Sequence, residues 1–212
     1  MVDYDPPLGS LKVLRQGAAF LCVEKPSGLL SVPGKDPAHW DCMETRVTAE
    51  FPDARIVHRL DMDTSGVMIF ALGAAAHRHL GLQFERRVVS KRYLAKVEGE
   101  VTAPRGRIDL PLITDWPNRP LQKICHETGK RSITRFVVLG RGKTSCVALY
   151  PRTGRSHQLR VHMKALGHPI LGDRLYGDPA SAHRLMLHAE RLRFRDPKGG
   201  AWITVTAPNF LK

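Results

Sequence analysis

The chain has 212 residues, enough for one domain with a substantial hydrophobic core. It carries 33 Lys and Arg against 20 Asp and Glu, and the resulting net charge of +13 favours polyanionic partners. Hydrophobic residues make up 42% of the chain, which argues against disorder, and no apolar run approaches membrane-spanning length. The first residues lack the basic and apolar pattern of a signal peptide, so we expect a cytoplasmic protein.

Hydrophobic periodicity predicts a series of elements, most of them strands. The first half predicts strands over residues 19–24 (continued over 29–32), 55–60 and 67–72, and helices over 41–51 and 74–87. The second half predicts strands over 92–97, 132–139, 144–150, 185–188 and 202–206, and a helix over 156–166 capped by Ser156. Many strands, few helices and no regular βαβ alternation predict an α+β fold with a mixed, largely antiparallel central sheet flanked by helices and loops.

No repeat or Ser/Gly-rich linker marks a domain boundary. A single domain over residues 1–212 is therefore the simplest prediction, with two sub-domains sharing one sheet as the alternative.

A polar loop over residues 58–66 places Asp61 at the end of a predicted strand, just before Thr-Ser-Gly. Loops carried by a rigid sheet are where reactive side chains are presented. Taken alone, however, an aspartate at this position is more often a turn cap.

A second segment, residues 152–162, is a glycine turn that opens a predicted helix rich in hydrogen-bond donors. His157, Arg160 and Lys164 are spaced to form one polar stripe on that helix. The side expected to be buried carries Leu159, Met163 and Leu166. Such a helix either binds phosphates at the surface or contributes to a catalytic site.

Metal binding is poorly supported by the sequence. The cysteines Cys22, Cys42, Cys125 and Cys146 lie far apart without a C-x-x-C pair, so reduced thiols are expected. His157 and His162 are five residues apart, unlike the four-residue spacing of a helical metal pair.

Positive charge is concentrated in residues 128–172, which contain no Asp or Glu. A solvated charged face usually mixes both signs, so this asymmetry favours nucleic acid over a membrane surface. The basic residues of this segment are Lys130, Arg131, Arg135, Arg141, Lys143, Arg152, Arg155, Arg160 and Lys164.

A third segment, residues 90–96, is a basic strand with one aromatic residue, Tyr93. A nucleobase can stack on such a tyrosine, although a tyrosine in a strand is more often half-buried packing.

In their order along the chain, the three segments resemble those of the RluA-type pseudouridine synthase family. Its members carry an H-R-L-D-x-x-T-S-G loop, a K-x-Y strand and an R-T-G-R-x-H-Q-[IL]-R-x-H segment, found here at residues 58–66, 91–93 and 152–162. Further matches at 25–34, 109–113, 115–120, 127–130 and 166–173 extend the resemblance over residues 20–208. It implies the pseudouridine synthase catalytic fold without an S4 domain. The segments at 116–120 and 154–162 imply a member that modifies uridines in 23S rRNA and in tRNA anticodon stem-loops.

The resemblance also implies roles for individual residues. Asp61 corresponds to the essential catalytic aspartate, Arg160 to the arginine that pairs with it, and Tyr93 to the tyrosine that packs on uracil. Removal of the C5 proton is the less favoured role of Tyr93, because a tyrosine with a pKa near 10 is a weak base. Arg160→Ala is therefore expected to lose more activity than stability. Arg59 corresponds to the arginine that fills the gap left by a flipped base, and His58 is expected to support the loop. The residues expected to contact RNA are Arg59, His58, Lys91, Arg92, Lys130, Arg152, Arg155 and His157.

The expected partner is RNA, with no cofactor, no metal, no membrane and no protein partner, and the chain is expected to be a monomer. Two alternatives stay open. The first is a non-catalytic RNA-binding module of the same fold. The second is a hydrolase that uses Asp61 with His58 or His157 as an acid/base pair.

Overall fold

The computed structural model describes residues 4–208. The chain divides into two units, one formed by Met1–Lys91 with His188–Lys212 and the other by Arg92–Leu187. The chain passes from the first unit to the second within β5 (Ser90–Glu98) and returns within β11 (Leu187–Arg195).

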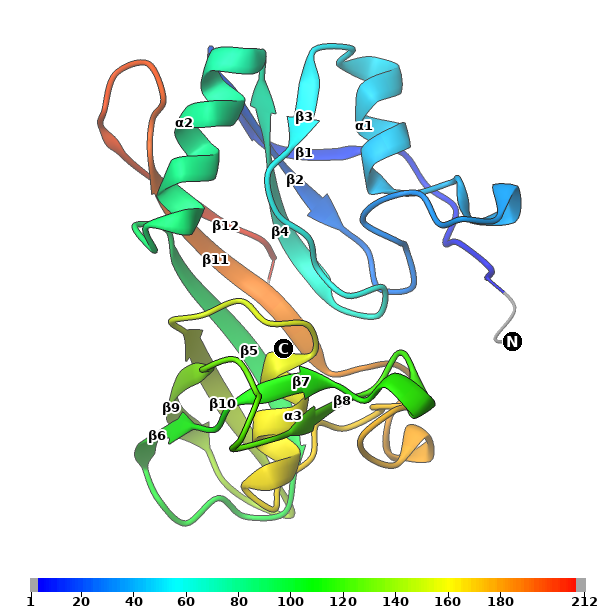
Figure 1. Cartoon of the computed structure of the whole chain (residues 1–212), viewed down its shortest axis with the longest axis vertical. Coiled ribbons are helices and arrows are strands. Elements are labelled where there is room, and N and C mark those ends of the chain that lie inside the picture. The colour runs from blue at the N-terminus through cyan, green and yellow to red at the C-terminus, as the bar shows by residue number, and fades with distance from the viewer. Residues whose placement is uncertain (1–3, 209–212) are drawn as a thin grey trace. The chain divides into compact units, whose positions relative to one another are not determined.

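The first unit contains a mixed set of strands (Figure 1). β1 (Lys12–Gln16) pairs with β2 (Phe20–Lys25), which pairs with β4 (Ser65–Leu72), and β3 (Ala54–Ile56) also pairs with β4; all three pairings are antiparallel. β11 runs parallel to β4, where His188 lies opposite Ser65, and β12 (Trp202–Thr206) is antiparallel to β11.

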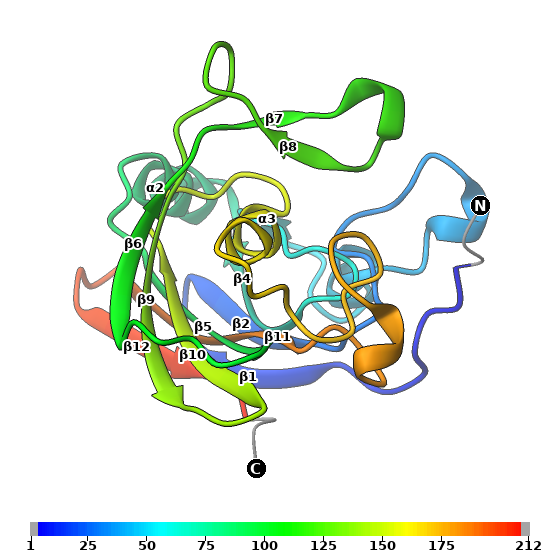
Figure 2. The ribbon, with the colours of Figure 1, turned by 90° about the horizontal axis from the view of Figure 1, so that it is seen from below.

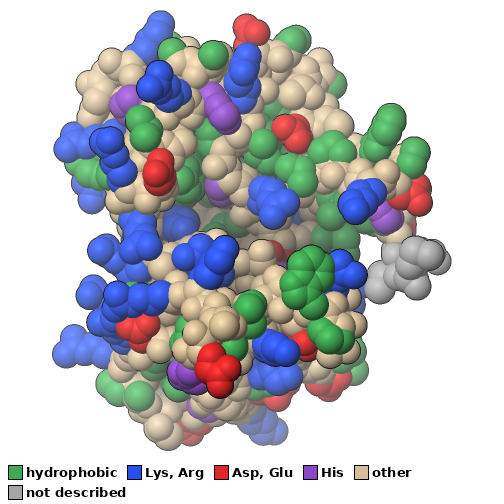
Figure 3. All heavy atoms as spheres, in the orientation of Figure 1, with side chains coloured by type: hydrophobic (Ala, Val, Ile, Leu, Met, Phe, Trp, Pro, Cys, Tyr) green, Lys and Arg blue, Asp and Glu red, His purple; other side chains and the backbone are tan. Residues whose placement is uncertain are grey.

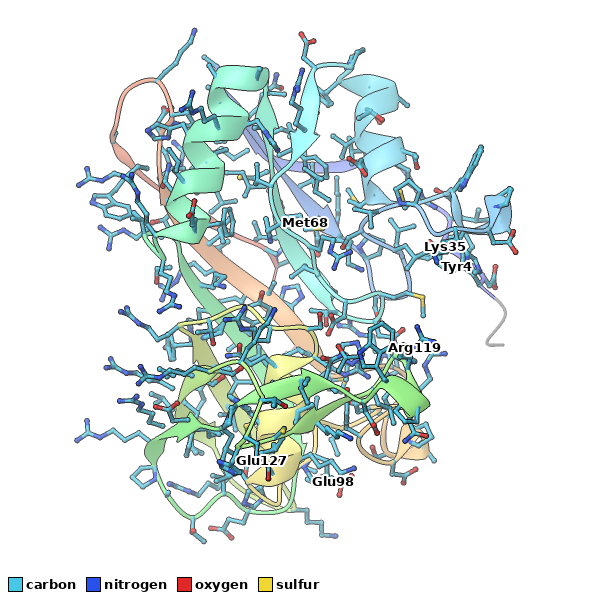
Figure 4. All side chains as sticks on the ribbon, viewed as in Figure 1. Tyr4, Lys35, Met68, Glu98, Arg119 and Glu127 are labelled. Carbon is cyan, nitrogen blue, oxygen red and sulfur yellow. The ribbon has the colours of Figure 1, made fainter. Side chains whose placement is uncertain are left out.

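Two helices complete this unit: α1 (Met43–Glu50) and α2 (Ala74–Glu85), with a short 3-10 turn at Pro37–His39. One face of β4 packs into the core cluster of this unit, where Ile69 lies with Phe20, Leu80 and Phe194. Successive side chains of a strand point to opposite faces. Met68, on the same strand, is also fully buried (Figure 4). The continuous apolar run of β4 is thus explained by burial on both sides, as predicted.

The second unit has four antiparallel strands in the order β5, β10 (Thr144–Pro151), β9 (Ile133–Gly140) and β6 (Arg105–Asp109). A separate hairpin pairs β7 (Leu112–Thr114) with β8 (Gln122–Ile124), and its connection holds the 3-10 turn Trp116–Asn118 with Arg119 beside it (Figure 4). Another 3-10 turn spans Pro179–Ser181.

Helix α3 (Gln158–Ala165) lies between these two layers (Figure 2). Leu159 and Met163 pack into the core cluster that contains Val147 of β10, whereas Val161 packs against Leu112 of β7. The helix is therefore covered on two opposite sides.

Most predicted elements are confirmed, but three strand predictions are wrong in extent. The strand predicted over 185–188 is β11, which runs over Leu187–Arg195. Residues 29–32 form only an isolated bridge, between Leu30 and Cys42. The strand predicted over 55–60 ends at Ile56, because the backbone of Leu60 is bound by a serine side chain instead of a neighbouring strand. The pattern also missed the short or strongly polar strands β1, β6, β7 and β8.

The helix prediction over 156–166 needs two corrections. The helix starts after His157, which occupies the cap position with a left-handed φ of 53°, so Ser156 is not the cap. The predicted polar stripe is not a surface stripe either, since Arg160 is 2% exposed while Leu166, expected to be buried, is 39% exposed. Packing on both sides of α3 overrides the amphipathic pattern.

Candidate active site

The backbone on both sides of Asp61 is held by residues 25–31. The Oγ of Ser31 donates to Leu60 O (2.7 Å) and accepts from Leu60 N (3.1 Å). After Asp61, Met62 O accepts from Lys25 Nζ (2.7 Å) and from Gly28 N (3.0 Å). The carbonyl groups before and after Asp61 are thus bound to the same short segment.

Two further bonds complete this set. Ser27 Oγ donates to Asp63 O (2.6 Å), and Thr64 N donates to Asp61 O (3.0 Å) to close the turn. These hydrogen bonds hold the backbone around Asp61 at several points. Little further ordering is then needed to position its carboxylate for a reaction.

Lys25 is the centre of this arrangement. Its fully buried ammonium group donates to Pro26 O (2.9 Å), Leu29 O (2.6 Å) and Met62 O (2.7 Å). Burial lowers the pKa of Lys25 to about 7, against the attraction of the Asp63 and Asp61 carboxylates, which raises it. Lys25 therefore holds the loop, and in its protonated form it interacts favourably with both carboxylates.

His58 attaches the start of the loop to β4. Its Nε2 accepts from Ile69 N (3.1 Å), and its ring stacks on Phe84 with a centroid distance of 4.8 Å. Burial, with a smaller effect of the Lys91 charge, lowers the pKa of His58 to about 3. A neutral ring is also what the hydrogen bond needs, because Nε2 must carry a lone pair.

The end of the loop is fixed against β11. Ser65 Oγ and His188 Nδ1 are 2.8 Å apart in the core. Gly66 has a φ of 120°, and a Cβ built there would come within 2.2 Å of Ala189 O. Only glycine fits this approach of β4 to β11.

The other predicted residues of the first unit are Arg59 and Lys91. Arg59 is exposed within the loop. Lys91 is partly buried, and burial lowers its pKa to about 8.

In the second unit, Arg160 forms an ion pair with Asp173. Its Nε donates to one carboxylate oxygen (2.8 Å) and its Nη2 to the other (2.6 Å), and the two residues are 2% and 0% exposed. The Arg160 Cζ also lies 5.1 Å from the centroid of the Tyr176 ring. The bidentate hydrogen bonds to Asp173 fix the plane of the Arg160 guanidinium group.

Asp173 is stabilised as a carboxylate despite its burial. Burial raises its pKa, but hydrogen bonds and charge from Arg160, with the N–H groups of Leu175 and Tyr176, outweigh it and leave the pKa below its ordinary value. Asp173 thus joins α3 to the turn at residues 173–177.

The turn before α3 is organised by Gln158. Its Oε1 accepts from Thr153 Oγ1 (2.7 Å) and Arg155 N (3.1 Å), and its Nε2 donates to Ile133 O (3.1 Å) on β9. The side chains of Arg152 and Arg155 are exposed on this turn. The turn therefore presents two arginines from a fixed backbone.

Two histidines of the same segment have defined neighbours. His157 Nδ1 lies 2.7 Å from Tyr176 Oη. His162 is buried, with Nδ1 2.9 Å from Thr134 Oγ1 and Nε2 3.1 Å from Leu110 O, and burial lowers its pKa.

The remaining predicted residues of the second unit lie at its strands and hairpin. Tyr93 is partly buried on β5, opposite Leu149, and packs against the core cluster. Arg92 precedes it and is partly buried, and Lys130 is exposed, with its backbone paired to Leu112. Lys and Arg side chains are prominent on the faces of both units in Figure 3.

Four of the predicted residues lie in the first unit and seven in the second. The first set is His58, Arg59, Asp61 and Lys91, and the second is Arg92, Tyr93, Lys130, Arg152, Arg155, His157 and Arg160. The pairing of Arg160 with Asp61 stays a prediction.

Sequence reasoning missed Lys25, Ser31 and Asp173 as organising residues. One signal was present, since Lys25 ends an apolar strand just before Pro-Ser-Gly. Among residues 4–208 no group of three or more potential ligands could hold a metal ion. In the same range no helix is both long and apolar enough to span a membrane.

Comparison with known proteins identifies the class. A family model described as RNA pseudouridylate synthase matches residues 19–165. The chain belongs to this RNA pseudouridylate synthase family, whose members are isomerases. The resemblance seen in the motifs and the expected enzyme class are thereby confirmed.

Individual relatives are similar over almost the whole chain. The dual-specificity RNA pseudouridine synthase RluA of Escherichia coli (strain K12) is 51% identical, over 98% of this chain and 98% of its own. RluA of Vibrio vulnificus (strain CMCP6) is 50% identical, over 93% of this chain and 83% of its own.

A solved structure confirms the fold class. Human RNA Pseudouridylate Synthase Domain Containing 1 aligns with a TM-score of 0.78 and 32% identity, covering 96% of this chain and 86% of its own. The predicted α+β pseudouridine synthase fold is therefore correct.

Proposed function

We propose that this chain isomerises loop uridines to pseudouridine in both 23S rRNA and tRNA anticodon stem-loops, with Asp61 as the catalytic residue. The observation that carries the proposal is the fixed backbone around Asp61, where Leu60 and Met62 are bound by Ser31, Lys25 and Gly28. Two RNA classes are included because relatives 50 and 51% identical are named dual-specificity enzymes.

The reaction sets clear demands on the site. The N1–C1′ bond must break, the uracil must turn, and a C5–C1′ bond must form while the C5 proton leaves to solvent. A carboxylate serves this either by attack at C1′ or by removal of the C2′ proton to give a glycal. Both routes require Asp61 to be ionised.

Positive charge near Asp61 supports the ionised form. Lys25 lies close enough for its charge to interact with Asp61 and Asp63. We further propose that Arg160 pairs with Asp61 during the reaction, as the motif implies. The ion pair with Asp173 supports this role by holding the guanidinium in one plane, and a guanidinium can bind more than one carboxylate through its five N–H donors.

Tyr93 is proposed to stack on the uracil, with Arg59 filling the gap that the flipped base leaves. A flipped base loses stacking worth a few kcal/mol, and loop uridines lose least, which favours loop substrates. The exposed Arg152, Arg155 and Lys130 are proposed to bind phosphates, together with His58, Lys91, Arg92 and His157 near the target. The proposal involves one chain acting in the cytoplasm on RNA alone.

Tritium release from RNA labelled at C5 of uridine tests the proposal. The wild type should release tritium from both tRNA and 23S rRNA transcripts without free uracil, and Asp61→Asn should release none while it binds RNA with unchanged affinity. Binding by the wild type without release would identify a binding module instead. Release of free uracil or of RNA fragments would identify a hydrolase.

A further inference from the structure

Strands β11 and β12 share an outward face that the site described above does not use. In β11, the buried Leu192 and Phe194 alternate with exposed arginines, as the two-residue period of a strand requires. In register, Arg191 lies opposite Thr206, Arg193 opposite Thr204 and Arg195 opposite Trp202. The Arg–Trp face is defined by these six exposed residues: Arg191, Arg193, Arg195, Trp202, Thr204 and Thr206.

Trp202 orders two of these arginines. The Cζ atoms of Arg193 and Arg195 each lie 4.4 Å from the centroid of its ring, which stays 40% exposed. Stacking engages the flat face of a guanidinium and leaves its in-plane N–H donors for an anion. Arg195 uses one of them on Gly200 O (2.9 Å). The two groups are held in place while most of their donors stay available.

The face has no acidic counterpart. Among residues 4–208, no carboxylate forms an ion pair with Arg191, Arg193 or Arg195. Two acids adjoin these arginines in sequence. Glu190 lies on the opposite side of β11, with Leu192 and Phe194, and Asp196 caps its own turn by accepting from Lys198 N (2.9 Å). Like charges side by side on one sheet face repel each other, so three neighbouring arginines are best explained by an external anion.

Helix α2 holds the end of the strand that carries the arginines. Gln83 of α2 binds the backbone of Arg195 at both groups, with Nε2 donating to its O (2.8 Å) and Oε1 accepting from its N (2.8 Å). Arginines two positions apart on a strand are about 6.6 Å apart. A regular row of fixed cations suits the repeating phosphates of a nucleic acid strand.

The Arg–Trp face lies far from the Asp61 loop, as measured along β11. β11 meets β4 where Ala189 lies opposite Gly66, the last residue of that loop. Arg195 is six residues further along β11, which corresponds to about 20 Å. A polyanion that reaches both places must extend well beyond one flipped nucleotide.

We propose that the Arg–Trp face binds the phosphate backbone of the substrate RNA outside the loop that carries the modified uridine. The inference rests on the proposed function, because the RNA held at this face is the RNA modified at Asp61. Its arginines bind phosphates, and the hydroxyls of Thr204 and Thr206 add donors. Contacts of this kind position an RNA without reading its sequence, which suits an enzyme with two RNA classes.

The test compares Arg193→Gln/Arg195→Gln with the control Arg55→Gln/Arg78→Gln, which removes the same charge from exposed positions of β3 and α2. Each protein is titrated with full-length tRNA and with a hairpin cut down to the anticodon loop on a short stem. We expect the first variant to bind full-length tRNA about tenfold more weakly, with a slope of log K against log salt smaller by about 2. Hairpin affinity and kcat for tritium release should equal those of the wild type.

A second variant separates charge from ordering. Trp202→Leu keeps every charge but removes the ring that orders two arginines, so it should weaken binding of full-length tRNA by a smaller factor with an unchanged salt slope. The inference is overturned if Arg193→Gln/Arg195→Gln binds both RNAs as the control does. Equal weakening on both RNAs, or weaker binding to anionic vesicles with tRNA affinity intact, would overturn it too. A wild type that binds tRNA but releases no tritium rejects the proposed function alone.

Discussion

Lys25 Nζ donates to the carbonyl oxygen of Met62 over 2.7 Å, directly after the proposed catalytic Asp61. The same ammonium group binds Pro26 O and Leu29 O, so one buried cation ties the loop to the turn that follows β2. Removing this group affects both the fold and the position of Asp61.

Lys25→Met should destabilise the protein by about 2 kcal/mol, because buried carbonyl groups lose their donor. Urea unfolding at pH 7 measures this, with Lys35→Met, an exposed lysine, as the control. The kcat for tritium release should fall while the affinity for RNA changes little. An unchanged kcat in a folded Lys25→Met protein would show that the loop does not need Lys25 for its position.

The effect of Lys25→Met on the free energy of unfolding should depend on pH. Burial lowers the folded-state pKa of Lys25 to about 7, below the ordinary value of 10.5. Between these values the unfolded chain binds a proton that the folded chain has released, so this group makes stability rise with pH. The wild type should gain stability from pH 7 to pH 9 relative to Lys25→Met, and a constant difference would contradict the lowered pKa.

His58 should make the protein sensitive to acid. Its folded-state pKa of about 3 lies below the ordinary 6.5, because burial disfavours the charged ring. Below pH 6.5 the unfolded chain takes up a proton that the folded chain does not, so stability is lost as pH falls. His58→Gln can still accept the Ile69 N–H but cannot titrate. Its unfolding free energy should fall less than that of the wild type between pH 7 and pH 5.

Arg160→Ala should cost about 3–5 kcal/mol of stability, because it leaves the buried Asp173 carboxylate without its cation. This changes the sequence-based expectation that activity suffers more than folding. Arg160→Met/Asp173→Asn should recover part of the loss, since no unpaired charge stays buried. If Arg160 pairs with Asp61, this double variant folds but has a strongly reduced kcat. A near-normal kcat would reject that pairing.

Gly66→Ala should destabilise the protein by about 3 kcal/mol, because the left-handed φ and the contact with Ala189 both exclude a Cβ. The matched control is Gly81→Ala in α2, where a Cβ would meet nothing within 4 Å. That change should stabilise the helix by about 0.5–1 kcal/mol. Thermal unfolding of both variants checks the prediction through opposite shifts of Tm.

The sequence by itself determined the fold class and the family, and it predicted which residues carry the chemistry. The apolar run of β4 and the alternation in β12 are local patterns, so they predicted their elements without knowledge of the neighbours. The Asp61 loop was predicted as a loop on a buried strand for the same reason. The order of the motifs was not needed to predict these elements; it was needed only to predict the family.

The tertiary structure alone decided which partners hold those residues. Lys25 and Met62 are 37 positions apart, Gln83 and Arg195 are 112 apart, and Arg160 meets Asp173 only because α3 and the following turn pack together. No period in the sequence encodes such pairs. Periodicity shows which side of an element is apolar, whereas burial of Lys25 and Arg160 depends on hydrogen-bond partners that only the folded chain brings within reach.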